Sequence, residues 1–67
     1  MNKFAERLKD LRVEKNLSQR QLAKELGISQ AAIARWESGS QIPNIVYGSH
    51  IAQYFSVSLD YLAGIED

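Results

Sequence analysis

Few residues of this chain could carry nucleophilic, acid–base or metal chemistry. His50 is the single histidine and cysteine is absent, which excludes thiolate nucleophiles, disulfides and thiolate metal sites. No Ser-His-Asp set or paired carboxylates can be recognised, since Asp60 is suited to cap a helix and Glu66 and Asp67 form the tail. We therefore expect no catalysis, no metal site and no cofactor.

The spacing of small and apolar residues within residues 17–39 points to binding instead. Gly27 is suited to a positive φ where we expect a Cβ to clash, and it opens a three-residue connection between two helical patterns. Ala23 is small enough for the two helices to cross almost in contact, and Ile33 is placed to hold the second helix on the first. This pattern predicts a helix-turn-helix, whose second helix can lie in the major groove of DNA.

These residues are positioned by helices, because almost every segment has helical periodicity and none alternates with period two for long. N-cap and capping-box signals start the helices, and glycines or Asn16 end them. The predicted helices cover about 2–15, 19–26, 29–37 and 45–55, with a last short one between Ser58 and Gly64. We expect an all-α fold of five short helices in a single domain, residues 1–67.

Charge is divided unevenly along a chain whose formal net charge is zero. Residues 1–35 hold eight basic and four acidic side chains, a net +4, whereas residues 36–67 hold four acidic side chains and no basic one, a net −4. Zero net charge argues against a nucleic-acid partner, but a basic half is compatible with one. Chance is the alternative explanation for this division. No apolar run approaches the ~20 residues that span a membrane, so no membrane contact is expected.

From about Phe4 to Gly64 the chain resembles the XRE family, the helix-turn-helix family of lambdoid phage repressors and Cro. The resemblance is carried by Arg12, Leu17-Ser18-Gln19, Leu22-Ala23, Leu26-Gly27-Ile28-Ser29, Ile33, Trp36-Glu37, Gly39, Pro43, Ile51-Ala52 and Val57-Ser58-Leu59-Asp60-Tyr61-Leu62. It implies the lambda-repressor-like fold with a helix-turn-helix at about 19–37. It also implies a transcriptional regulator, most directly a repressor, that binds double-stranded DNA sequence-specifically.

The resemblance implies that the helix beginning at Ser29 is the recognition helix, with one face opposite Ile33 and Trp36 turned to the groove. The residues expected to read bases are Ser29, Gln30, Ala31, Ala34 and Arg35. Glutamine can bond adenine N6 and N7, arginine can bond guanine O6 and N7, and small side chains can touch a thymine methyl. Helix propensity alone also explains the two alanines, and Arg35 could reach a phosphate instead.

The resemblance also implies contacts to the DNA backbone. Gln19 is expected to hold a phosphate beside the exposed N–H groups of its helix, and Arg12 to lie near the backbone while pairing with Glu37. The other expected backbone contacts are Ser18, Arg20, Ser38, Ser40, Gln41 and Asn44. Capping alone also explains Ser18, and exposure to solvent alone explains Arg20.

Two features depart from the family pattern. The loop after the recognition helix, where the family places Lys or Arg, carries the neutral Ser40, Gln41 and Asn44. Binding is therefore expected to be weaker or less sensitive to salt than in a basic relative. Gly48 replaces a large aliphatic residue, and a glycine inside a helix costs about 0.5–1 kcal/mol relative to alanine.

Apolar and aromatic residues of the second half exceed what so small a core needs. The expected homodimer interface comprises Val46, Tyr47, Tyr54, Tyr61 and Ile65. A two-fold dimer would place two recognition helices about 34 Å apart on a palindromic operator. Local packing around Gly48 is the alternative explanation for these residues.

The function expected is thus a DNA-binding regulator of prokaryotic or phage type in the cytoplasm. A protein-interaction module on the same fold is an alternative, such as an antitoxin or anti-repressor that binds a protein through the acidic second half. The chain could also be the DNA-binding fragment of a longer regulator.

Overall fold

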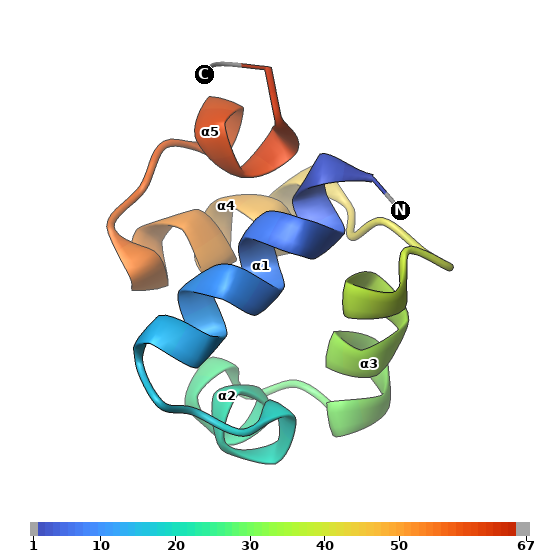
Figure 1. Ribbon diagram of the computed structural model, residues 1–67. Helices are drawn as coiled ribbons and strands as arrows, with labels where there is room; N and C mark the ends of the chain where they lie inside the picture. Colours follow the sequence, from blue (N-terminus) through green and yellow to red (C-terminus); the bar gives the residue numbers. More distant parts are fainter. Residues whose placement is uncertain (1, 66–67) are drawn as a thin grey trace.

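The computed structural model describes residues 2–65, and its regular elements are five α-helices (Figure 1). They are α1 (Lys3–Glu14), α2 (Gln19–Leu26), α3 (Gln30–Ser38), α4 (Ile45–Phe55) and α5 (Leu59–Ala63). No strand occurs between residues 2 and 65. The predicted all-α fold of five short helices is therefore confirmed, with boundaries that agree to within about two residues.

Side chains that bond nearby backbone groups explain where the helices begin. The N-cap side chain of each helix accepts a hydrogen bond from the backbone N–H three residues later, and the five caps are Asn2, Ser18, Ser29, Asn44 and Ser58. At α2 the predicted capping box is complete, since Gln21 also accepts from the Ser18 N–H at 2.7 Å. Each cap satisfies a backbone donor that has no partner inside its helix.

Residues in the left-handed conformation end the helices, as predicted for Asn16 and the glycines, whereas Ser56 at the end of α4 was not predicted. Gly27, Gly39 and Gly64 have φ values of +71°, +83° and +83° at the ends of α2, α3 and α5. Asn16 has φ +58° just after α1, and Ser56 has φ +57° after α4. The chain can therefore reverse direction sharply between helices, which keeps all five in contact with one core.

The core takes one large, fully buried side chain from every helix. These five residues are Leu8, Leu22, Ile33, Ile51 and Leu62. α1 crosses the middle of the molecule, contacting α3 and α5, while α2 packs on α3 and α4 (Figure 1). Every helix is thus held by burial of apolar area, the dominant favourable term in folding.

Gly48 is buried in α4, where a side chain of α5 fills the space beside it. A Cβ at this position would lie 3.3 Å from Leu59 Cδ1. Val46 is 72% exposed and does not fill this space, while the Tyr47 ring packs on Trp36 with centroids 5.8 Å apart. Leu59 therefore replaces, from α5, part of the bulk that α4 lacks.

Gly48→Ala is expected to raise the free energy of unfolding by about 0.5 kcal/mol. Alanine gains about 0.5–1 kcal/mol of helix propensity over glycine, and the Leu59 methyl that it meets borders an open groove into which it can move. Urea unfolding followed by circular dichroism measures the change. Gly64→Ala is the opposed control, because its φ is +83° and its Cβ would lie 2.6 Å from Lys3 Cβ. A loss of stability in Gly48→Ala would mean that Leu59 cannot shift.

Candidate nucleic-acid interface

The connection between α2 and α3 holds the two helices of the predicted helix-turn-helix in a fixed relation. Ala23 and Ile33 are buried at 4% and 0% exposure, and the two helices contact each other. Gly27 has the predicted positive φ, but the expectation that a Cβ there would clash is wrong, because nothing lies within 4 Å of that position. The left-handed backbone alone favours glycine here.

One face of α3 is turned to solvent, and the predicted base-reading residues lie on it or at its start. Ser29, Gln30, Ala31 and Arg35 are exposed and Ala34 is half-buried. Ile33, Trp36 and Glu37 are buried on the other side of the helix. Because Ala31 and Ala34 are small, another molecule can approach the backbone of α3 closely between Gln30 and Arg35.

A buried ion pair ties α1 to α3. Arg12 Nε lies 2.6 Å from Glu37 Oε2 and Arg12 Nη2 lies 2.9 Å from Glu37 Oε1, so the contact is bidentate. Arg12 Nη1 also donates to the Leu17 carbonyl at 2.7 Å, which holds the chain between α1 and α2. The hydrogen bond to Glu37 raises the pKa of the Arg12 guanidinium above its ordinary value, although burial opposes the change.

Gln19 joins this network from the start of α2. Its Nε2 donates to Glu37 Oε1 at 3.2 Å, so Glu37 holds three elements together. Arg12 and Gln19 were expected at the DNA backbone, and the structure places both at a shallow hollow of about 350 Å³ between α1, α2 and α3. The hollow is lined by Lys9, Arg12, Gln19, Ala34, Glu37 and Ser38.

Lys9 is a residue that the sequence analysis missed. It is exposed and lies one helical turn before Arg12 on α1, so it brings a second cation to the hollow. The spacing of three residues, which puts two basic side chains on one side of a helix, was the available signal. Cations beside a polar amide are a suitable arrangement for a phosphate.

The loop after α3 is engaged with its own chain. Ser38 Oγ and Ser40 Oγ donate to the Arg35 carbonyl at 3.0 and 3.2 Å, and Asn44 accepts from the Tyr47 N–H as the cap of α4. Gln41 Oε1 accepts from Arg35 Nε at 2.9 Å. These residues and the exposed Arg20 were expected to contact DNA phosphates, and a phosphate contact by any of them remains a prediction.

Two of the residues expected at a dimer interface have contacts within the chain, and a dimer contact by any of the set remains a prediction. The Tyr54 hydroxyl donates to Glu25 at 3.1 Å, and the Tyr61 ring lies under the Arg7 guanidinium at 4.3 Å. Partial burial raises the pKa of the Tyr54 hydroxyl, and the Glu25 carboxylate adds to the rise. Both tyrosines thus have partners within the chain, and Tyr47 packs on Trp36 while it remains 43% exposed; Val46 and Ile65 are exposed.

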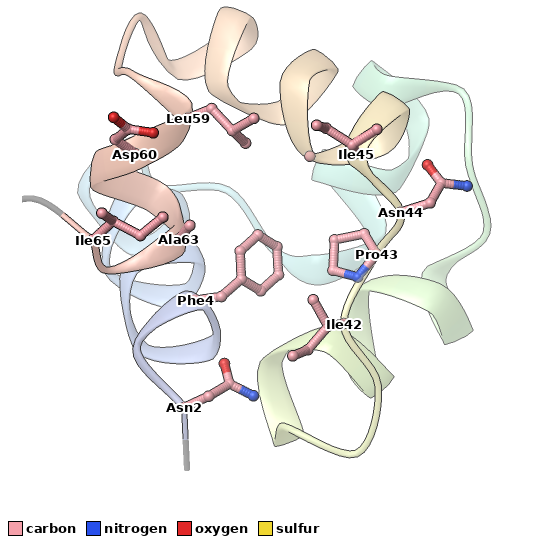
Figure 2. Close-up of a pocket in the computed structure, with 11 residues that line it drawn as sticks. Asn2, Phe4, Ile42, Pro43, Asn44, Ile45, Leu59, Asp60, Ala63 and Ile65 are labelled. Carbon is pink, nitrogen blue, oxygen red and sulfur yellow. The ribbon is translucent and has the colours of Figure 1, made fainter.

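An open apolar groove of about 520 Å³ lies between the start of α1, the α3–α4 loop and α5 (Figure 2). Phe4 lies between Ile42, Pro43 and Ile45 on one side and α5 residues such as Leu59 on the other. Of the predicted dimer residues, only Ile65 lines it. Ile42 and Ile45 also line it and are 67% and 71% exposed. Between residues 2 and 65, no helix is long and apolar enough to cross a membrane and no acidic or histidine cluster could hold a metal.

Comparison with known proteins relates this arrangement to a family. A family model described as helix-turn-helix matches residues 8–62. The HTH-type transcriptional activator BcrR of Enterococcus faecalis is 45% identical over 64 residues, which cover 96% of this chain and 31% of that protein. The phage CTXphi transcriptional repressor RstR of Vibrio cholerae serotype O1 is 37% identical over 62 residues, covering 92% of this chain and 55% of RstR. The chain thus spans about a third to about half the length of these two relatives.

Two further relatives match over nearly their whole length. The uncharacterized HTH-type transcriptional regulator MJ0272 of Methanocaldococcus jannaschii is 36% identical over 61 residues, covering 91% of this chain and 92% of MJ0272. The crystal structure of the P22 c2 repressor in complex with a synthetic operator superposes with a TM-score of 0.88 at 27% identity. That match covers 98% of this chain and 100% of the other. The chain therefore belongs to the XRE-type helix-turn-helix family, the family of the lambdoid phage repressors and Cro.

Proposed function

We propose that the chain is the DNA-binding unit of a transcriptional repressor of prokaryotic or phage type, and that it acts by binding and not by catalysis. It lays the exposed face of α3 in the major groove of double-stranded DNA. The observation that carries this proposal is the arrangement of that face. Gln30 and Arg35 stand at either end of two small alanines, beside a hollow that holds Lys9 and Arg12. The structural similarity to an operator-bound repressor over 98% of the chain supports the proposal that α3 faces the DNA.

Different surfaces supply specificity and affinity in this proposal. Gln30 and Arg35 pair with base edges, while Ala31 and Ala34 allow close approach and contact with thymine methyl groups. Lys9, Arg12 and Gln19 hold phosphates on the flanking backbone. The neutral loop at residues 40–44 adds no cation, so counterion release comes mainly from α1 and α2.

We further propose that two copies bind a palindromic operator. Exposed apolar side chains support this, since Ile42, Ile45 and Ile65 border the groove and are 67–76% exposed. Covering such a patch with its counterpart on a second copy would bury apolar area on both. This groove is a second candidate contact beside the predicted set of Val46, Tyr47, Tyr54, Tyr61 and Ile65, of which Tyr54 and Tyr61 also have contacts within the chain.

Selection of bound duplexes from a random pool tests the function. The wild type is expected to enrich one palindromic sequence. Gln30→Ala and Arg35→Ala are each expected to lower discrimination at one base position per half-site by about 10–100-fold, since a bidentate pair is worth about 1–3 kcal/mol. Gln19→Ala is expected to weaken binding to all sequences alike, because a phosphate contact carries no base information.

Equilibrium binding to the selected duplex and to its single-base variants gives these values. The exposed Gln53 of α4 offers a matched control, and Gln53→Ala is expected to bind as the wild type does. If Arg35→Ala lowered the affinity for selected and for random DNA equally, Arg35 would not be a base-reading residue. Failure to enrich any sequence would contradict the proposed function and favour a protein partner.

A further inference from the structure

Arg35 is held at both its backbone and its side chain by the loop that follows α3. Its carbonyl oxygen accepts hydrogen bonds from Ser38 Oγ, Ser40 Oγ and the backbone N–H groups of Ser40 and Gln41, at 3.0 to 3.3 Å. Its side chain donates from Nε to Gln41 Oε1 at 2.9 Å. The segment 38–41 therefore closes on a single residue of the exposed face of α3.

The bond to Gln41 engages one edge of the guanidinium and leaves the other available. A guanidinium has five N–H donors, of which Nε carries one and the two terminal nitrogens carry four. Among residues 2–65 the structure records no hydrogen bond from the terminal nitrogens of Arg35. Bidentate contact with guanine O6 and N7 requires two donors in a fixed orientation, and an exposed arginine otherwise samples many rotamers.

We propose that Gln41 is a positioning residue for Arg35, one that accepts the Nε–H and holds the guanidinium in the orientation that reads a guanine. The inference rests on the proposed function and deepens it, because it assigns Gln41 to base specificity and not to the DNA backbone. It also accounts for a neutral residue at position 41, where the side chain must accept a hydrogen bond. Lysine or arginine at position 41 has no acceptor atom and could not make this bond.

The first test examines DNA binding by variants at position 41. Gln41→Ala is expected to lower discrimination at the base position that depends on Arg35 about fivefold, the effect of one net hydrogen bond, and to leave the other positions unchanged. Gln41→Glu retains an acceptor and is expected to keep that discrimination, while its charge weakens binding to all sequences. In an Arg35→Ala background, Gln41→Ala is expected to change nothing further at that position.

If Gln41 instead contacted the phosphate backbone of the DNA, different results would be expected. Gln41→Ala would then weaken all duplexes equally, and its effect would add to that of Arg35→Ala. That pattern would overturn the inference while leaving the proposed function standing. Gln53→Ala again serves as the matched control.

The second test needs no DNA. The NMR order parameter of the Arg35 Nε–H in the free protein is expected to fall in Gln41→Ala and to stay unchanged in Gln53→Ala. An unchanged order parameter in Gln41→Ala would overturn the inference whatever the DNA results. A fall in the order parameter would support the restraint of Arg35 by Gln41. If the wild type nevertheless enriched no sequence, that restraint would not serve base reading, and the proposed function would be contradicted as well.

Discussion

Glu37→Ala is expected to lower the free energy of unfolding by about 3–5 kcal/mol, the usual cost of removing one partner of a buried ion pair. The side chains of Arg12 and Glu37 are only 12% and 4% exposed, so the substitution leaves a guanidinium with little solvent and no counter-charge. Gln19 loses its partner in the same step. At about 0.05–0.15 kcal/mol per residue, a chain of 67 residues has about 3–10 kcal/mol of stability, so a large part of this margin disappears. Urea unfolding at neutral pH, followed by circular dichroism, measures the loss.

Two controls separate the pair from a general effect of removing a carboxylate. Glu14 is exposed at the end of α1, and Glu14→Ala is expected to change stability by less than about 0.5 kcal/mol. The double variant Arg12→Met/Glu37→Leu removes both charges and is expected to recover most of the loss, because apolar replacement of a buried pair is often neutral or stabilising. A loss below about 1 kcal/mol in Glu37→Ala would show that the pair behaves as a solvated surface pair.

Ile33→Ala is expected to lower the free energy of unfolding by about 2–5 kcal/mol. Ile33 is fully buried, and together with Trp36 it fixes α3 in the core. Its truncation removes apolar contact and leaves a cavity that five short helices cannot readily close. The loss of stability is obtained from the shift of the urea midpoint, provided that the dependence of the unfolding free energy on urea concentration is unchanged.

Ile33→Val is the matched variant, with an expected loss of about 0.5–1.5 kcal/mol. Because selected DNA binds the folded state alone, it is expected to raise the midpoint of both variants when present in excess. A loss in Ile33→Ala no larger than that in Ile33→Val would mean that α3 is held mainly by the network around Glu37 and not by its apolar side.

The helices could be predicted from the sequence because their boundaries depend on residues close together in the chain. Ser18 bonds the N–H of Gln21, Ser29 bonds that of Ala32, and Gly27 takes the left-handed conformation within its own turn. Such signals act over three or four residues, so tertiary packing does not alter them. The same locality explains why the exposed face of α3 was foreseen.

Other features of the site depend on contacts between distant residues. Gln19 meets Glu37 18 positions away, and Tyr54 meets Glu25 29 positions away. Composition shows that tyrosines are abundant, but it does not distinguish a ring that faces a partner from one that packs under an arginine of the same chain. Likewise, the spacing of Lys9 and Arg12 puts both on one side of a helix, but only the packing of α1, α2 and α3 places Lys9 beside Gln19.

The distribution of one large, fully buried side chain per helix also bears on how the protein is maintained in a cell. No helix can detach without exposing one of Leu8, Leu22, Ile33, Ile51 or Leu62, so the opening of any one helix costs free energy through lost apolar burial. Proteases that cleave opened chains then act on the small population in which one or more helices have opened. A substitution far from α3 that costs 1–2 kcal/mol would therefore reduce the amount of protein several-fold and change regulation through abundance alone.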